Sequence, residues 1–139
     1  MPAARPLVVL VEDEELIRRL LQRVLESADY EVLVAPNGED ALRLIEGRAG
    51  ELALLLTDLV MPGMSGLELA RAARELQPDL PVLCMSGYSE QMLRDRGGDD
   101  EEVSFIEKPF APGELTDRVA ALLRAAEREG SRSESFERE

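Results

Sequence analysis

The sequence predicts an α/β domain in which one parallel β-sheet carries helices on both faces. Two observations support this fold class. Short, nearly continuous aliphatic runs alternate along the chain with amphipathic segments of helical period. Aliphatic runs without polar alternation are typical of strands that are covered on both faces. Because the strand–helix order repeats five times, the sheet is expected to be doubly wound.

The aliphatic runs are the predicted strands. In chain order they are Leu7–Val11, Tyr30–Ala35, Leu52–Thr57, Pro81–Ser86 and Val103–Ile106. The first helix is predicted from an apolar stripe that runs from Leu16 to Leu25, with arginines on the opposite side. The last helix has the same spacing from Leu115 to Ala126, and Pro112 suits its first turn.

Helix starts are also visible in the middle of the chain. Asn37 with Asp40, and Ser65 with Glu68, have the spacing of helix N-cap pairs, and the second pair matches a capping box. The segment Gln91–Glu102 has the weakest helix pattern, because a Gly-Gly-Asp-Asp run interrupts it. The fourth helix is therefore predicted to be short.

The chain has 139 residues, which is the size of one ordinary domain. Its apolar fraction of 45% is typical of a globular protein. We assign residues 1–126 to this domain. Residues 127–139 are charged and rich in small residues, and we interpret them as a frayed end, a flexible tail or a linker stub.

Composition excludes several classes of function. The formal net charge of −13 disfavours direct binding to nucleic acid or to anionic membranes. No apolar stretch is long enough to span a membrane, and the N-terminus is not a signal peptide. The single cysteine, Cys84, lies in an apolar run and fits a reducing cytoplasm. The absence of histidine excludes Ser-His-Asp catalysis, histidine-ligated zinc and a phosphohistidine within this chain.

Polar residues stand at the carboxyl ends of four predicted strands. They are Glu12 and Asp13 after the first, Asp58 after the third, Ser86 at the end of the fourth and Lys108 after the fifth. Each has a plain structural explanation, such as an acid at a helix start, a turn residue or a surface lysine. Ligands of open parallel sheets bind beside the carboxyl ends of the strands, so their shared placement favours a common site.

The chemistry of this set points to phosphoryl transfer. Two carboxylates about 4 Å apart repel by about 4 kcal/mol at an effective dielectric near 20, so either their pKa values rise or a cation lies among them. Oxygen ligands without His or Cys suit a hard ion such as Mg²⁺ (or Mn²⁺). Lys108 and Ser86 would hold an anion beside that ion, which favours transfer onto the carboxylate of Asp58.

With these residues placed, residues 6–125 resemble the receiver domain of bacterial two-component response regulators. The resemblance rests on VLVEDEE, LLLTDLVMPGMSGLEL, VLCMSGYS and FIEKPF, in this order and at the family's separations. It implies a flavodoxin-like sheet with strand order 2-1-3-4-5. It also implies that Asp58 is the phosphorylated aspartate, and that Glu12, Asp13 and the backbone carbonyl of Val60 hold Mg²⁺ with it.

The resemblance assigns further roles. Ser86 matches the hydroxyl residue that contacts the phosphoryl group, and Phe105 matches the aromatic switch position. Lys108 matches the family's lysine, and the Lys108–Pro109 peptide bond is expected to be cis. Glu12 stands where Asp is common, Phe105 lacks the hydroxyl of a tyrosine, and Ala111 replaces the Ser or Thr that often caps the last helix.

The expected partner is a histidine kinase or a histidine phosphotransfer protein that donates to Asp58. The stretch from Met61 to Glu90 also looks like receiver domains of hybrid sensor histidine kinases. Homodimerisation, the cognate kinase and the output stay open. Two rival readings remain: a phosphatase with an aspartyl-phosphate intermediate, which would need a carboxylate where Val60 stands, and an interaction module that does not use phosphorylation. We predict a phosphoacceptor domain, not a turnover enzyme.

Overall fold

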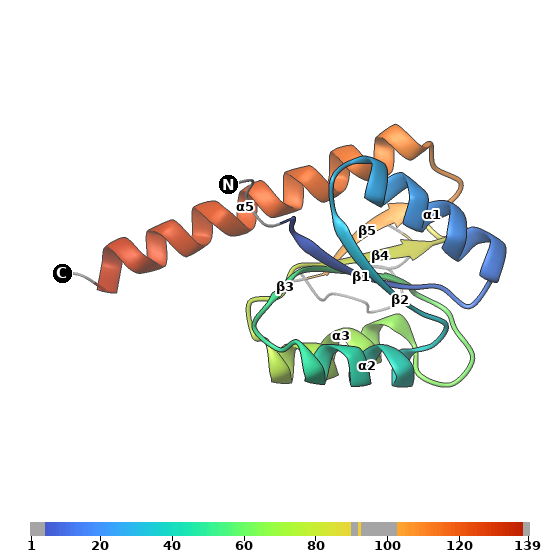
Figure 1. Ribbon diagram of the computed structural model, residues 1–139, viewed down its shortest axis with the longest axis horizontal. Coiled ribbons are helices and arrows are strands. Elements are labelled where there is room, and N and C mark those ends of the chain that lie inside the picture. Colours follow the sequence, from blue (N-terminus) through green and yellow to red (C-terminus); the bar gives the residue numbers. More distant parts are fainter. Residues whose placement is uncertain (1–4, 90–91, 93–102, 138–139) are drawn as a thin grey trace.

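The computed structural model describes residues 5–89, 92 and 103–137 (Figure 1). Along the chain its elements are β1 (Leu7–Val11), α1 (Glu15–Ser27), β2 (Glu31–Ala35), α2 (Gly38–Gly47), β3 (Leu52–Asp58), α3 (Gly66–Leu76), β4 (Val82–Ser86), β5 (Val103–Glu107) and α5 (Pro112–Glu137). The strands form one parallel sheet in the order β2-β1-β3-β4-β5. The predicted fold class and strand order are confirmed, and each predicted strand agrees with the observed one to within one residue at either end.

Helices cover both faces of the sheet, with α1 and α5 on one side and α2 and α3 on the other (Figure 1). Successive side chains of a strand point to opposite faces, so each strand supplies two hydrophobic cores. In β3, Leu55 packs toward α2 and α3, whereas Leu54 and Leu56 pack toward α1 and α5. This double burial explains why the strands are continuous aliphatic runs.

The predicted caps form as expected in the two helices that begin beside the site. Asn37 Oδ1 accepts the backbone N–H of Asp40 at 2.8 Å. At the start of α3, Ser65 and Glu68 form a capping box, with both hydrogen bonds 3.2 Å long. The caps at Asn37 and Ser65 fix where α2 and α3 begin at the carboxyl edge of the sheet.

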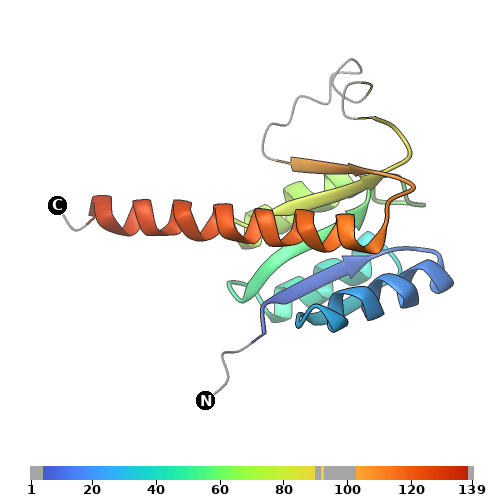
Figure 2. The same ribbon diagram turned by 90° about the horizontal axis from the view of Figure 1, so that it is seen from above.

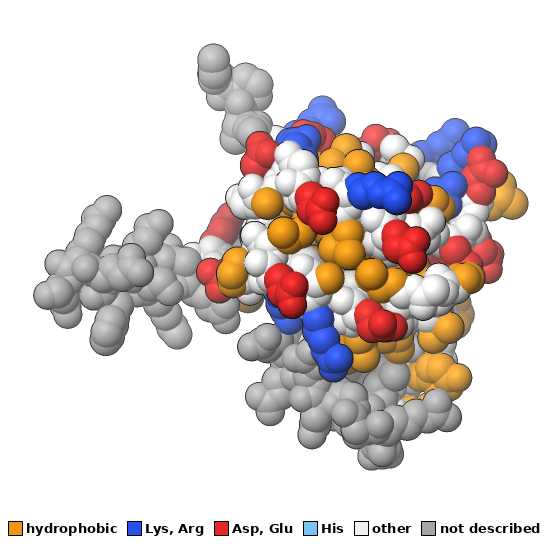
Figure 3. All heavy atoms as spheres, turned by 90° about the horizontal axis from the view of Figure 1, so that it is seen from below, with side chains coloured by type: hydrophobic (Ala, Val, Ile, Leu, Met, Phe, Trp, Pro, Cys, Tyr) orange, Lys and Arg blue, Asp and Glu red, His pale blue; other side chains and the backbone are white. Residues whose placement is uncertain are grey.

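On the outer surface of α2 and α3, hydrophobic side chains are interspersed with charged ones (Figure 3).

Helix α5 is longer than the sequence indicates. It continues to Glu137, so the backbone after Glu127 is helical where we expected a frayed end, and it projects beyond the sheet (Figure 2). Once the packed first half has formed, each further residue adds a helical hydrogen bond at little cost. The division between a domain ending at 126 and a separate tail stays a prediction.

Two other expectations concern the fourth helix and the absence of a membrane-spanning segment. The predicted short fourth helix falls on residues 91–102, which lie outside the described residues except for Met92. Among the residues that the structure describes, no helix is long and apolar enough to cross a membrane.

Candidate functional site

Glu12 is buried at the end of β1 and is held at three points. Only 1% of its surface is exposed. Its N–H donates to the Ala35 carbonyl of β2 at 3.2 Å, and its own carbonyl accepts Arg18 Nη1 at 2.8 Å. Its Oε1 accepts the N–H of Glu14 at 3.3 Å. Its Oε2, by contrast, is buried and makes no hydrogen bond within the described structure.

Asp58 is the last residue of β3 and is 6% exposed. Its backbone carbonyl accepts the Thr57 hydroxyl at 2.9 Å, and the N–H of Leu59 donates to the Met85 carbonyl at 2.9 Å. The following loop folds back onto Asp58 at Gly66, where a Cβ atom would lie 2.3 Å from the Asp58 carbonyl oxygen. A glycine is therefore required at this position for the loop to close against the strand.

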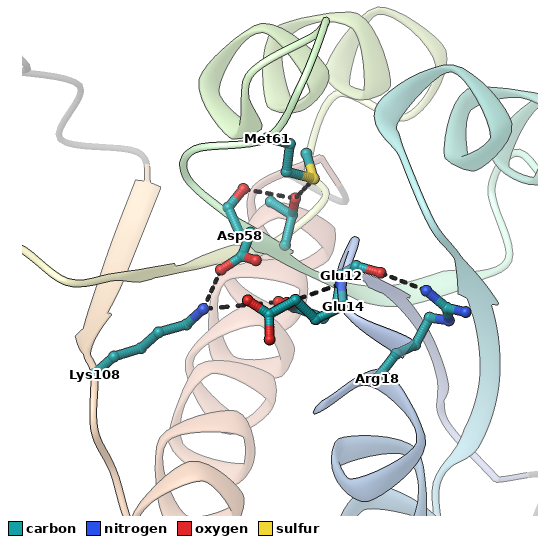
Figure 4. Close-up of polar contacts among 7 residues, drawn as sticks. Glu12, Glu14, Arg18, Asp58, Met61 and Lys108 are labelled. Atoms are coloured by element: carbon teal, nitrogen blue, oxygen red, sulfur yellow. Dashed lines mark hydrogen bonds and ion pairs between the residues drawn. The ribbon is translucent and has the colours of Figure 1, made fainter. Parts of the chain in front are cut away.

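Lys108 brings a positive charge to these carboxylates. Its Nζ lies 2.5 Å from Asp58 Oδ1 and 3.7 Å from Glu12 Oε2 (Figure 4). Its backbone N–H donates to the Ser86 carbonyl at 2.7 Å, which ties the segment after β5 to the end of β4. The Lys108–Pro109 peptide bond is cis, as the resemblance implied.

Burial, and after it the neighbouring Asp58 carboxyl, raise the pKa of Glu12 to about 8, although Lys108 and the Glu14 N–H oppose the rise. A protonated Glu12 can donate to Asp58, which is part of the second effect. Burial lowers the pKa of Lys108, but the hydrogen bond and charge of Asp58, together with Glu12 and Glu14, outweigh this, and its pKa is raised. The site thus holds more negative charge than Lys108 alone neutralises.

The donor set fits a divalent metal ion. Carboxylate oxygens of Glu12, Asp13 and Asp58 lie within 4.8 Å of one another. Oε2 of Glu12 is a buried acceptor without a hydrogen bond, and because Lys108 Nζ is 3.7 Å away, a closer cation or a proton would be needed to satisfy it. Oxygen ligands alone are the set that Mg²⁺ and Mn²⁺ take in proteins.

The other predicted residues lie around this cluster. Ser86 ends β4, is 3% exposed, and its Oγ accepts the Tyr88 N–H at 2.9 Å. Phe105 lies inside β5 opposite Cys84, and its side chain belongs to the core on the α2 and α3 face of the sheet. Val60 lies in the loop two residues after Asp58, with 72% of its surface exposed. Ligation by its carbonyl stays a prediction.

A family model for the response regulator receiver domain matches residues 8–120. The chain belongs to this receiver family. ResD of Bacillus subtilis (strain 168), a transcriptional regulatory protein, is 38% identical over 119 residues, which are 86% of this chain and 48% of ResD. The receiver protein CpdR of Brucella abortus (strain 2308) is 35% identical and is matched over 98% of its length.

Among solved structures, the receiver domain from the hybrid histidine kinase CckA has a TM-score of 0.73 and 36% identity, and the match covers 84% of this chain and 98% of that one. This receiver domain thus spans about half the length of ResD but nearly all of CpdR. The prediction of a receiver domain, with the hybrid kinase receivers among its relatives, is confirmed. As a receiver domain, it is a regulatory signalling domain.

Sequence reasoning missed three residues that shape the site of this receiver domain. Arg18 binds the carbonyl of Glu12, Thr57 binds the carbonyl of Asp58, and Gly66 lets the loop after β3 return. Gly66 could have been predicted from the sequence, because it directly follows Ser65, the residue that caps α3. The contacts of Arg18 and Thr57 are made to backbone carbonyls, and residue type alone gives no signal for them.

Proposed function

We propose that this receiver domain accepts a phosphoryl group on Asp58 from a phosphohistidine of a partner protein, in a reaction that depends on Mg²⁺ or Mn²⁺. The observation that supports it best is the buried Asp58 carboxylate, placed between the Lys108 ammonium and the carboxylates of Glu12 and Asp13. Each of these groups has one task in such a transfer. The partner would be a histidine kinase or a histidine phosphotransfer protein, because this chain contains no histidine.

In the transfer, an Asp58 carboxylate oxygen attacks phosphorus. The new O–P bond forms as the N–P bond of the donor breaks, and its electron pair stays on the imidazole nitrogen. Lys108, which pairs with Asp58 in this state, is placed to follow the charge onto the phosphoryl oxygens. Its ammonium therefore remains neutralised throughout, at first by the carboxylate and afterwards by the phosphate.

Glu12, Asp13, Asp58 and the carbonyl of Val60 would hold the metal ion. When bound, it neutralises the carboxylates and stabilises charge on the transferred phosphoryl oxygens. Without a cation, burial and Asp58 keep the pKa of Glu12 near 8, so part of the acid cluster is protonated at neutral pH. Glu12 would therefore have to give up this proton before it could serve as a ligand.

The signal would be read through Ser86 and Phe105. The Ser86 hydroxyl turns from the Tyr88 N–H toward the phosphate, and the space that it leaves favours the inward position of the Phe105 ring. Only 9% of the surface of Phe105 is exposed in this state, so phosphorylation would shift the population further toward a buried position of the ring that already exists. Because Phe105 lacks a hydroxyl, its position depends on burial alone.

The direct test is to incubate the protein with acetyl phosphate and Mg²⁺ and to measure the intact mass. We expect the addition of one phosphoryl group, which EDTA and the Asp58→Asn substitution both abolish. Asp117→Asn, which changes an exposed aspartate of α5, is the matched control and should be modified as the wild type is. Equal labelling of Asp58→Asn would overturn the acceptor. Absence of labelling in the wild type would favour an interaction module that does not use phosphorylation.

A further inference from the structure

The backbone carbonyl of Glu12 is bound by a side chain that lies outside the acidic cluster. Arg18 reaches back from α1 and donates from Nη1 to that oxygen at 2.8 Å (Figure 4). The backbone N–H of Arg18 donates to the Glu14 carbonyl at 2.9 Å, which closes the first turn of the helix. One residue thus connects the acidic turn to the start of α1.

This contact matters because no side chain caps the start of α1. Glu14, at the N-cap position of α1, makes no side-chain cap, unlike Asn37 and Ser65 in the next two helices. A hydrogen bond from a charged guanidinium is about twice as strong as a neutral one. The N–H, the carbonyl and Oε1 of Glu12 are all hydrogen-bonded, so only Oε2 lacks a hydrogen bond, and this atom lies 3.7 Å from Lys108 Nζ.

We propose that Arg18 is a positioning residue of the metal site. By fixing the Glu12 carbonyl, it sets the turn so that Oε2 faces Asp58 and Lys108, and not solvent. This inference rests on the proposed function, in which Glu12, Asp13 and Asp58 bind the metal ion. Groups that orient metal ligands contribute to affinity without touching the ion, and their loss costs about 10–100-fold in binding.

The neighbouring arginine provides a matched control. Arg19 pairs with Glu15 at 2.7 Å on the outer face of α1, and its side chain is 69% exposed. Exposed pairs of this kind contribute little. Arg18→Met and Arg19→Met remove the same charge from adjacent positions of one helix, so a difference between them reports on the contact with Glu12.

The experiment is a Mn²⁺ titration of the unphosphorylated full chain, with the free ion followed by electron paramagnetic resonance. We expect the dissociation constant of Arg18→Met to rise on the order of tenfold. We expect Arg19→Met to stay within about twofold of the wild type. Arg18→Lys, which keeps a charged donor, should fall between the two. Equal affinities of the Arg18→Met and Arg19→Met variants would overturn the inference.

Two further readouts separate positioning from folding. In acetyl phosphate labelling, Arg18→Met should need more Mg²⁺ for half-maximal rate and should recover the wild-type rate when Mg²⁺ saturates. A purely structural role would lower stability to urea in EDTA and leave the Mn²⁺ affinity unchanged, which would also overturn the inference. Failure of the wild type to bind Mn²⁺ would overturn the metal site itself. Mn²⁺ binding without labelling would instead remove only the acceptor role of Asp58.

Discussion

Lys108 Nζ and Asp58 Oδ1 lie 2.5 Å apart, although 50 residues separate them in the chain. The pair forms because β3 and β5 both end at the same edge of the sheet, with β4 between them. The printed sequence contains no other lysine. The titration of this ammonium can therefore be followed without overlap from another lysine, and the first prediction uses this.

We predict that the ammonium of Lys108 titrates above 10.5, because Asp58 and Glu12 raise its pKa. Stability from this pair is fully present below 10.5 and is lost as the pH rises through the higher folded-state value. Protein labelled with ¹³C-lysine gives one side-chain signal whose pH titration reports this pKa. The Asp58→Asn variant should titrate at lower pH than the wild type, and an unchanged titration would contradict the pairing.

The raised pKa of Glu12 predicts a second pH dependence of stability. Its sign is opposite to that of a carboxylate whose pKa is lowered on folding. The folded-state Glu12 pKa of about 8 lies above the ordinary glutamate value of 4.5, so between these pH values the folded state binds more protons than the unfolded state. In EDTA, the free energy of unfolding should therefore fall as the pH rises from about 4.5 to about 8. The loss should amount to a few kcal/mol, since one pKa unit corresponds to about 1.4 kcal/mol.

Urea unfolding at a series of pH values measures this dependence, and Glu12→Gln is its matched control. The amide has the shape of the neutral acid and cannot ionise, so most of the slope in this window should disappear. A wild-type stability that stays flat or rises across the window would show that Glu12 is ionised in the folded, metal-free protein.

How far sequence reasoning reached is clearest at individual residues. Asp58 and Lys108 could be placed together because parallel topology alone brings the carboxyl ends of strands to one edge. Arg18 could not, since its contact depends on the exit angle of α1 and on one rotamer, and neither leaves a pattern in the residue types. The length of α5 was missed because charged and small residues beyond the core give weak local preferences, which the preceding helix overrides.

Gly66 offers a test of loop closure. In Gly66→Ala the new Cβ would meet the Asp58 carbonyl oxygen at 2.3 Å and Leu59 Cα at 3.0 Å, so backbone must move. We expect stability to fall by about 1–3 kcal/mol and the Mn²⁺ affinity to weaken with it, as measured by urea unfolding and metal titration. Gly113→Ala, whose Cβ would meet nothing within 4 Å in α5, should instead stabilise by about 0.5 kcal/mol.

The proposed movement of the Ser86 hydroxyl predicts a change in the chemical shift of the Tyr88 amide proton. In this state the Tyr88 N–H donates to Ser86 Oγ at 2.9 Å. When beryllofluoride and Mg²⁺ mimic phosphorylation, the hydroxyl turns away, so the Tyr88 amide proton resonance should move upfield as this hydrogen bond is lost. The shift is followed in ¹⁵N-labelled protein, and Asp58→Asn should not show it. An unmoved Tyr88 amide in beryllofluoride-bound protein would rule out the proposed movement of Ser86.

The tail gives the last prediction. Among the side chains that the structure describes, those of α5 in the hydrophobic core are Leu115, Val119, Leu122 and Leu123, all of which precede residue 127. Removing residues 127–139 should therefore change the free energy of unfolding by no more than about 0.5 kcal/mol. Ending the chain before Val119 should unfold it, which circular dichroism would show. A loss above about 2 kcal/mol on removing 127–139 would make the tail part of the domain.

Three segments meet at the site only when the sheet is complete. They are the loop that closes at Gly66, the turn at Glu12 and the segment after β5. The acids Glu12 and Asp13, the proposed acceptor Asp58 and the cation Lys108 lie at the ends of three different strands, and Lys108 is the last of them along the chain. A chain that lacked β5 and Lys108 would hold these carboxylates without the lysine beside them. We therefore expect a chain that lacks β5 to accept a phosphoryl group poorly, so that only a complete domain would be able to carry the proposed signal.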